Sequence, residues 1–263
     1  MPPRVLVFSP HPDDAEWFAG GTIARMAAEG AEVGIVVVSD GRRGSFEHDS
    51  ETLARIRKGE AVRGAAALGA GEPIWLGHAD LELDTLPPGK LREQFIRLIR
   101  QRRPDVVIAE DAFFPNEIHP DHRAVALAAS DAVSFASLPL MHPEHLDAGL
   151  EPHFVVEKYF YAAAPSAINK IVDITDTMDR KLAAMGEHRS QVSFLVEDVR
   201  RQARLAGIDL ETILGQAAGD PMAALTWAIQ AEASEVGRRE GLAYGEAFRY
   251  VRFHPIVEAL LGV

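Results

Sequence analysis

Two short segments of the chain place histidine, proline and aspartate in the same order. Residues 11–14 read His-Pro-Asp-Asp, and residues 119–122 read His-Pro-Asp-His. One such segment alone is more often a helix cap beside a loop histidine than a functional site. Two of them, each following a short apolar run, are hard to attribute to capping alone. Imidazole and carboxylate groups in one place are typical metal ligands.

Three side chains from these segments form a candidate metal site: His11, Asp14 and His122. Two imidazoles and one carboxylate with an open fourth position are typical of catalytic zinc rather than structural zinc. Zinc bound in this way lowers the pKa of its water to about 7 and polarises a carbonyl group. Fe²⁺ suits the same three ligands. The chain has no cysteine, so a bound metal must use histidine and carboxylate ligands.

The neighbouring side chains suggest roles in hydrolysis. Asp13 lies beside a ligand and diverges from it, so it is a candidate general base for the attacking water. His119 precedes His122 by three residues and is a candidate donor to a developing oxyanion. Asp121 is a candidate to orient one of the histidines. Together these roles predict hydrolysis of an amide or an ester.

Alternating strand and helix patterns place both segments at one edge of a sheet. Unbroken apolar runs, typical of strands covered on both faces, occur at residues 4–9, 32–39, 73–76 and 105–109. Helical patterns occur at residues 15–29, 50–68 and 88–102, and a fourth helix is expected to start just after residue 121. This alternation predicts an α/β fold with a mostly parallel sheet, in which ligands bind at the carboxyl ends of the strands.

The composition argues against several other classes of function. The chain has 263 residues, with 27 Lys and Arg against 39 Asp and Glu, for a formal charge of −12. Such an acidic balance disfavours binding to nucleic acid or to anionic lipid. No window approaches the roughly 18 apolar residues of a membrane span, and the first residues do not resemble a signal peptide. We therefore expect a cytoplasmic protein that binds neither nucleic acid nor membrane.

Several motifs together carry a family resemblance that extends from about Val5 to Gln191. Besides the two His-Pro-Asp segments, the chain contains Gly20-Gly21-Thr22, Ser39-Asp40-Gly41, Arg57-Lys58-Gly59-Glu60-Ala61, Leu68-Gly69, Val172-Asp173-Ile174-Thr175 and His188-Arg189-Ser190-Gln191. In this order, the motifs resemble those of the PIG-L/LmbE-like zinc-dependent de-N-acetylases. Glu117-Ile118 and the run Lys158-Tyr159-Phe160-Tyr161 resemble most the diacetylchitobiose deacetylase branch.

The resemblance implies a Rossmann-like fold and the removal of an acetyl group from N-acetylglucosamine-type sugars. It implies one Zn²⁺ per subunit, with Fe²⁺ or another divalent ion as the alternative, and assigns the metal ligands to His11, Asp14 and His122. It assigns the general base to Asp13 and assistance at the tetrahedral intermediate to His119. It also implies a homo-oligomer, either a trimer or a hexamer.

The candidate substrate contacts are Arg57, Asp121 and His254. Arg57 matches a family arginine that contacts substrate hydroxyl groups, although an ion pair with Glu60, three residues on, explains this arginine equally well. His254 lies near the C-terminus, from which an oligomer could deliver it to a neighbour's site. Some family members carry a tyrosine two residues before the second His-Pro-Asp segment. This chain has Glu117 there, so the resemblance supplies no hydroxyl group at that position.

These observations predict a Rossmann-like catalytic domain over residues 1–192 and a helical C-terminal extension over residues 193–263 packed on it, or a single structural domain. Two further strands are expected at residues 154–163 and 170–174, followed by mostly helical chain to about residue 229. The predicted activity is metal-dependent removal of an N-acetyl group from a small, chito-oligosaccharide-like amino sugar. Hydrolysis of the amide of a thiol-glycoside conjugate is the alternative. A non-catalytic sugar-binding relative is disfavoured because all three ligand positions and the base are present.

Overall fold

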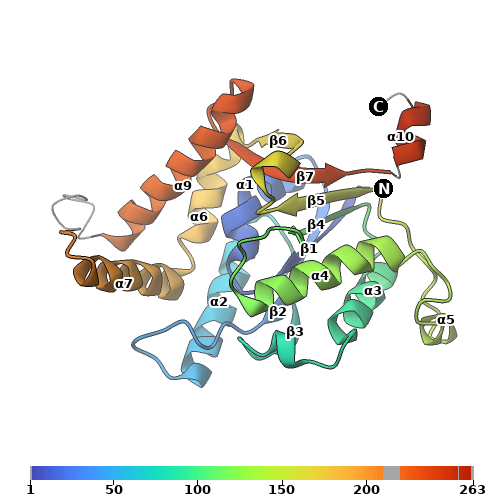
Figure 1. The fold of residues 1–263 in the computed structure, drawn as a ribbon, viewed down its shortest axis with the longest axis horizontal. Helices are drawn as coiled ribbons and strands as arrows, with labels where there is room; N and C mark the ends of the chain where they lie inside the picture. The colour runs from blue at the N-terminus through green and yellow to red at the C-terminus, as the bar shows by residue number, and fades with distance from the viewer. Residues whose placement is uncertain (1, 210–219, 254, 262–263) are drawn as a thin grey trace.

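The computed structural model describes residues 2–209, 220–253 and 255–261. In this part of the chain, seven strands form one sheet in the order β3-β2-β1-β4-β5-β7-β6 (Figure 1). The strands are β1 (Arg4–Ser9), β2 (Glu32–Ser39), β3 (Ile74–His78), β4 (Val106–Glu110), β5 (Glu157–Tyr161), β6 (Lys170–Asp173) and β7 (Gly245–Val251). The pairs from β3 to β5 are parallel, whereas β7 pairs antiparallel with both β5 and β6. The predicted mostly parallel α/β sheet is confirmed.

Helices cover both faces of the sheet because the central strands are apolar on both faces. In β1, Val5 and Val7 pack against one set of helices, and Leu6 and Phe8 pack against another set. The first set is α1 (Asp14–Ala28), α2 (Ser50–Leu68) and α6 (Met178–Met185), and the second is α3 (Lys90–Arg102) and α4 (Pro120–Phe135). The remaining described α-helices are α5 (Glu144–Asp147), α7 (Arg189–Leu205), α9 (Pro221–Gly237) and α10 (Pro255–Leu261). Within the described ranges, none of the helices has both the length and the apolar character needed to cross a bilayer.

The carboxyl ends of β1 and β4 position the two His-Pro-Asp segments. These two strands are direct parallel neighbours, so their ends lie at the same edge of the sheet. The turn after β1 is held by Ser9, whose Oγ donates to the carbonyl oxygen of His11 at 2.7 Å. Helix α4 begins with a proline, and Nδ1 of the preceding His119 accepts the backbone N–H of Asp121 at 3.2 Å. Both segments therefore end in the first turn of a helix.

The C-terminal region contributes a strand that the predicted helical extension did not include. Strand β7 lies between β5 and β6, and its Glu246 is buried. The Glu246 carboxylate accepts the backbone N–H groups of Gly21 and Thr22 in α1, at 2.9 and 2.8 Å, and pairs with Lys181 of α6 at 2.6 Å. A buried charge with such distant partners does not follow from a local apolar pattern, which explains why β7 was missed. The predicted division at residue 192 falls inside α7.

The close packing of α1 against the segment after β6 gives a stability prediction. A Cβ atom on Gly21 would lie 2.6 Å from Cβ and 2.7 Å from Cγ2 of Ile174, which is closer than van der Waals contact. We expect Gly21→Ala to lower the free energy of unfolding by about 1–3 kcal/mol, measured by urea denaturation. The control is Gly59→Ala in α2, where the nearest atom is the end of the Arg63 side chain at 3.4 Å. This control should raise stability by up to about 1 kcal/mol, and equal effects of the two substitutions would contradict the packing argument.

Candidate active site

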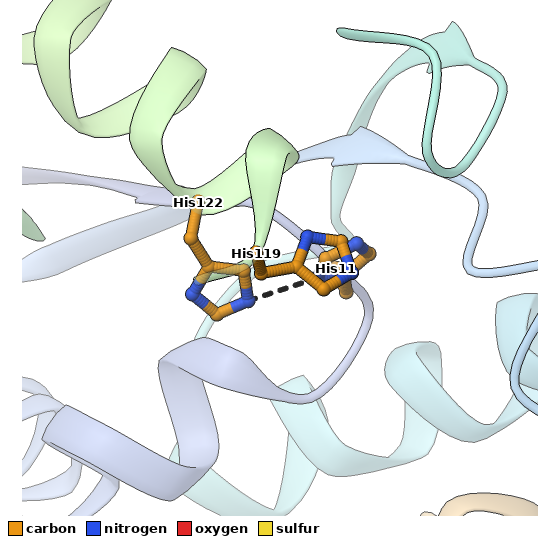
Figure 2. Close-up of side chains that lie close together, drawn as sticks. All are labelled: His11, His119 and His122. Carbon is orange, nitrogen blue, oxygen red and sulfur yellow. Dashed lines mark hydrogen bonds between the residues drawn. The ribbon is translucent and has the colours of Figure 1, made fainter. Parts of the chain in front are cut away.

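The three predicted ligands lie together at the end of the sheet. Nδ1 of His11 lies 3.2 Å from Oδ2 of Asp14 and 3.2 Å from Nε2 of His122. The third side of this triangle, from His122 Nε2 to Asp14 Oδ2, is 3.5 Å. Ligands that surround zinc tetrahedrally at 2.0–2.1 Å are about 3.3 Å apart, so the three atoms fit one cation. Figure 2 shows the rings of His11, His119 and His122 gathered from two segments that are distant in the sequence.

The electrostatics of the site favour a positive charge between these side chains. Burial would lower the pKa of His122, but the Asp14 and Glu110 carboxylates raise it to about 9. Burial also opposes protonation of His11, yet hydrogen bonds to neighbouring carboxylates, Asp121 first among them, hold its pKa well above its ordinary value. Burial would raise the pKa of Asp14, but the two imidazoles hold it well below its usual range. The site therefore attracts positive charge where a bound cation would lie.

In each ligand histidine, the ring nitrogen that faces away from the other ligands lies close to a carboxylate. The sequence interpretation identified only one of these carboxylates, that of Asp121. Nε2 of His11 lies 3.1 Å from Oδ1 of Asp80 and 3.3 Å from Oδ2 of Asp121. Nδ1 of His122 lies 2.8 Å from Oε2 of Glu110, whose pKa burial raises to about 7. Asp121 was predicted to orient a histidine, whereas the contacts of Asp80 with His11 and of Glu110 with His122 were not predicted. Their positions offered a signal, because Glu110 ends β4 and Asp80 follows β3 by two residues.

His119 lies beside both ligand histidines, and each of the three rings has a nitrogen within 4.8 Å of a nitrogen of the other two. Its ring centroid is 4.6 Å from that of His11 and 5.1 Å from that of His122. Nδ1 of His119 accepts the backbone N–H of Asp121, so a neutral His119 ring carries its proton on Nε2. Burial, together with the positive charges of His11 and His122, lowers the pKa of His119. A neutral ring with a protonated Nε2 is a hydrogen-bond donor.

Asp13 occupies the N-cap position of α1, but its side chain makes no capping hydrogen bond. Instead, its Oδ1 accepts a hydrogen bond from Nη2 of Arg57 at 2.6 Å, and Nη1 of Arg57 donates to the carbonyl oxygen of Gly41 at 3.0 Å. The alternative ion pair between Arg57 and Glu60 is wrong, because the Glu60 carboxylate instead accepts the N–H and the hydroxyl of Ser190. Arg57 is 3% exposed and thus lies beneath Asp13 rather than at the surface.

Gly41 makes the contact between Arg57 and Asp13 geometrically feasible. It adopts a φ of +63°, and a Cβ atom there would lie 2.2 Å from Nη1 of Arg57. A side chain at this position would therefore displace the arginine from Asp13 as well as strain the backbone. Gly41 of the motif Ser39-Asp40-Gly41 therefore leaves room for the arginine that holds the candidate base.

The structure places Asp121, the second predicted substrate contact, away from the surface. Asp121 is fully buried, and its two oxygens accept the backbone N–H groups of Leu83 and Leu81 at 3.1 and 2.8 Å. It therefore lies behind His11 rather than at a surface that a substrate reaches, which corrects its assignment as a substrate contact. His254 lies outside the described residues. Glu117 accepts the backbone N–H of His119 at 2.7 Å.

A residue of β7 reaches the loop between β4 and α4, and sequence reasoning missed it. Arg249 forms an ion pair with the buried Asp111 and lies 5.5 Å from the ring centroid of Phe113. Asp111 in turn begins the loop that leads to His119 and His122. The C-terminal region therefore supports a segment that carries part of the candidate site.

Comparisons with known proteins agree with this arrangement. A profile of the PIG-L family, described as GlcNAc-PI de-N-acetylase, matches residues 6–133. The diacetylchitobiose deacetylase of Thermococcus kodakarensis is 36% identical over 191 residues, which span 72% of this chain and 70% of the relative. A probable N-acetyl-alpha-D-glucosaminyl L-malate deacetylase 2 of Bacillus cereus is 29% identical over 81% of this chain and 94% of its own length.

Solved structures give the same result. The N,N'-diacetylchitobiose deacetylase of Pyrococcus horikoshii, solved with its inhibitor MPG, superposes with a TM-score of 0.77 and 32% identity. The match covers 95% of this chain and 84% of that protein. These similarities confirm the resemblance inferred from the paired His-Pro-Asp segments. The chain belongs to the PIG-L family of de-N-acetylases.

Proposed function

We propose that this protein is a metal-dependent hydrolase that removes the N-acetyl group from a small molecule containing N-acetylglucosamine, of the chito-oligosaccharide type. The observation that carries the proposal is the triangle of His11, Asp14 and His122, with Asp13 beside it. The names of the relatives also support it, because they specify deacetylases of diacetylchitobiose and of an N-acetylglucosaminyl conjugate. They favour deacetylation over the alternative hydrolysis of a thiol-glycoside conjugate.

The three ligand side chains would hold one divalent cation, which we propose to be Zn²⁺, with Fe²⁺ or another divalent ion as the alternative. A cation bound there polarises the acetamide carbonyl and lowers the pKa of a bound water to about 7. The choice of Zn²⁺ rests on the donor set, since two imidazoles and one carboxylate are typical of catalytic zinc.

Asp13 is suited to move the proton of the attacking water. Arg57 holds one of its carboxylate oxygens, which leaves the other to accept that proton as water adds to the acetamide carbon. We propose that the Nε2–H of His119 donates to the oxygen on which negative charge develops, because Nδ1 already accepts the backbone N–H of Asp121. Asp13 then returns the proton to the nitrogen as the carbon–nitrogen bond breaks. The products are acetate and the free amino sugar.

Acetate release tests the proposed function directly. The purified protein is treated with a chelator; acetate is assayed with diacetylchitobiose and with an N-acetylglucosaminyl conjugate, and the freed amine is assayed with a cysteinyl-sugar amide. We expect release from an acetylated amino sugar that stops on chelation and returns with about one Zn²⁺ per chain. Absence of acetate with every substrate and every added divalent metal would contradict the proposal. Cleavage of the cysteinyl-sugar amide alone would support the alternative reaction.

The location and assembly of the protein stay predictions. We propose that it acts in the cytoplasm as a homo-oligomer, a trimer or a hexamer, on the basis of family resemblance. Light scattering coupled to size-exclusion chromatography measures the mass of the assembly.

A further inference from the structure

A second group of metal-ligand side chains lies far from the candidate active site. His142, Glu144 and His145 each offer one ligand atom, and these atoms lie within 4.8 Å of one another. They belong to α5 and the turn before it, which follow the C-terminal end of α4 (Figure 1). His119 and His122 lie at the other end of α4, whose 16 residues span about 24 Å at about 1.5 Å per residue. The proposed reaction uses no member of this second group.

His142 and Glu144 are already as close together as two ligands of one ion. Nδ1 of His142 lies 3.0 Å from Oε1 of Glu144. Ligand atoms around tetrahedral zinc are about 3.3 Å apart, so a cation that replaces the proton between these two atoms can bind both. The two side chains are 21% and 57% exposed, so an ion can reach them from solvent. Their contact therefore forms an accessible edge of a candidate site.

His145 has a buried ring nitrogen without a hydrogen-bond partner among the described residues. The whole residue is buried, and its ring centroid lies 5.3 Å from that of His142. Its Nε2 lies 2.9 Å from Oε1 of Glu93, a carboxylate that also accepts Nε–H of Arg97 at 2.8 Å. A proton on Nε2, facing Glu93, leaves a lone pair on Nδ1, for which the described part of the chain offers no donor. Such a buried lone pair is costly unless a hydrogen bond or a metal satisfies it.

The turn that carries His142 is held in an unusual conformation. His142 has a φ of +60°, which is uncommon for a residue other than glycine. Arg100 is 2% exposed and holds this turn, because its guanidinium group donates to the carbonyl oxygens of Met141 and His142 at 2.8 and 3.2 Å. A fixed turn keeps the rings of His142 and His145 side by side, which reduces the entropy lost when both bind one ion.

We propose that His142, Glu144 and His145 form a second metal site, in which Nδ1 of each histidine and the Glu144 carboxylate bind one Zn²⁺. Two imidazoles and one carboxylate suit this ion, and Glu93 orients the ring of His145 from behind. The bound ion links α5 to α3, which carries Glu93. The ligand atoms are spread over up to 4.8 Å, whereas those of the candidate active site are 3.2–3.5 Å apart. The second site must therefore contract around its ion, so it should bind zinc more weakly and empty on desalting.

Titration of the desalted protein with Zn²⁺ tests this site by calorimetry. The wild type should bind about one further Zn²⁺ per chain, and His122→Ala, which lacks a ligand of the candidate active site, should show the same event. His142→Asn removes a ligand and should weaken this event by about 100-fold or more, the upper end of the loss seen when only an outer partner of a ligand is removed. Asparagine is the chosen replacement because it tolerates a left-handed backbone.

Two further measurements identify the other ligands. Glu144→Gln removes a carboxylate from an exposed side chain and should also weaken the second event. Its matched control is Glu151→Gln, an exposed glutamate seven residues on, which should leave the event unchanged. Nitrogen-15 spectra of His122→Ala should show the Nδ1 resonance of His145 shifting on addition of zinc, while Nε2 keeps its proton. These spectra replace a substitution of His145, whose buried ring also supports the fold.

The absence of a second zinc-binding event in the wild type would overturn the inference. A second event of unchanged affinity in both His142→Asn and Glu144→Gln would do so as well, because the ion would then lie elsewhere. An unshifted Nδ1 resonance of His145 at saturating zinc would remove that residue from the site and so contradict the proposed ligand set. Acetate release plays no part in these measurements, so this inference and the proposed function fail separately.

Discussion

Asp13→Asn should leave the metal bound and lower kcat by about 10²- to 10⁴-fold, the range typical of a lost general base. The substitution keeps the shape of the side chain and an oxygen that Nη2 of Arg57 can donate to. It removes the carboxylate that accepts the proton of water and later protonates the amine. The rate of acetate release at saturating substrate measures the effect.

The zinc content of Asp13→Asn separates loss of the base from loss of the metal. We expect about one Zn²⁺ per chain by elemental analysis, because Asp13 is not part of the triangle of His11, Asp14 and His122. Full turnover with normal zinc content would show that another residue is the base. Loss of zinc together with activity would instead move Asp13 into the ligand set.

His122→Ala should abolish both metal binding and turnover. The substitution removes one of three ligand atoms and leaves His11 Nδ1 and Asp14 Oδ2 as a two-ligand site. A site with two protein ligands binds zinc weakly, and without the metal neither the water nor the carbonyl group is activated. We expect the zinc content to fall well below one per chain and acetate release to fall by several orders of magnitude.

His48→Ala is the matched control for this substitution, because His48 is exposed on the loop before α2. The control should keep both its zinc content and its turnover. Stoichiometric zinc with normal acetate release in His122→Ala would remove His122 from the ligand set. Such a result would refute the metal site on which the proposed function depends.

The parts of the fold that depend on local pattern were predicted closely. The bounds of β1, β2 and α2 agree with the predicted ranges 4–9, 32–39 and 50–68. Helix α2 ends where expected because Gly69 adopts a left-handed conformation, with a φ of 83°, that suits a glycine after a helix. The candidate ligands were also predicted, since parallel strands β1 and β4 bring their carboxyl ends together.

The missed features depend on contacts between distant parts of the chain. Asp80 and Glu110 are ordinary acidic residues in the sequence, and their role follows only from the rings they face, His11 and His122. For Arg57, sequence reasoning weighed a nearby partner, whereas the observed partner is distant in the sequence. Local spacing suggested a partner one helical turn away, but the fold brings Asp13, 44 positions earlier, within hydrogen-bond distance.

The position of β7 affects the order in which the protein assembles on the ribosome. In the sheet, β7 lies between β5 and β6 and pairs with both. In the sequence, however, α6, α7 and α9 all lie between β6 and β7. The newly made β6 must therefore remain without its neighbour until residues 245–251 have also been translated. Pairing of such late, non-local strands slows folding and leaves backbone edges open to wrong partners. A nascent chain that stops before residue 245 would expose one side of β5 to other chains.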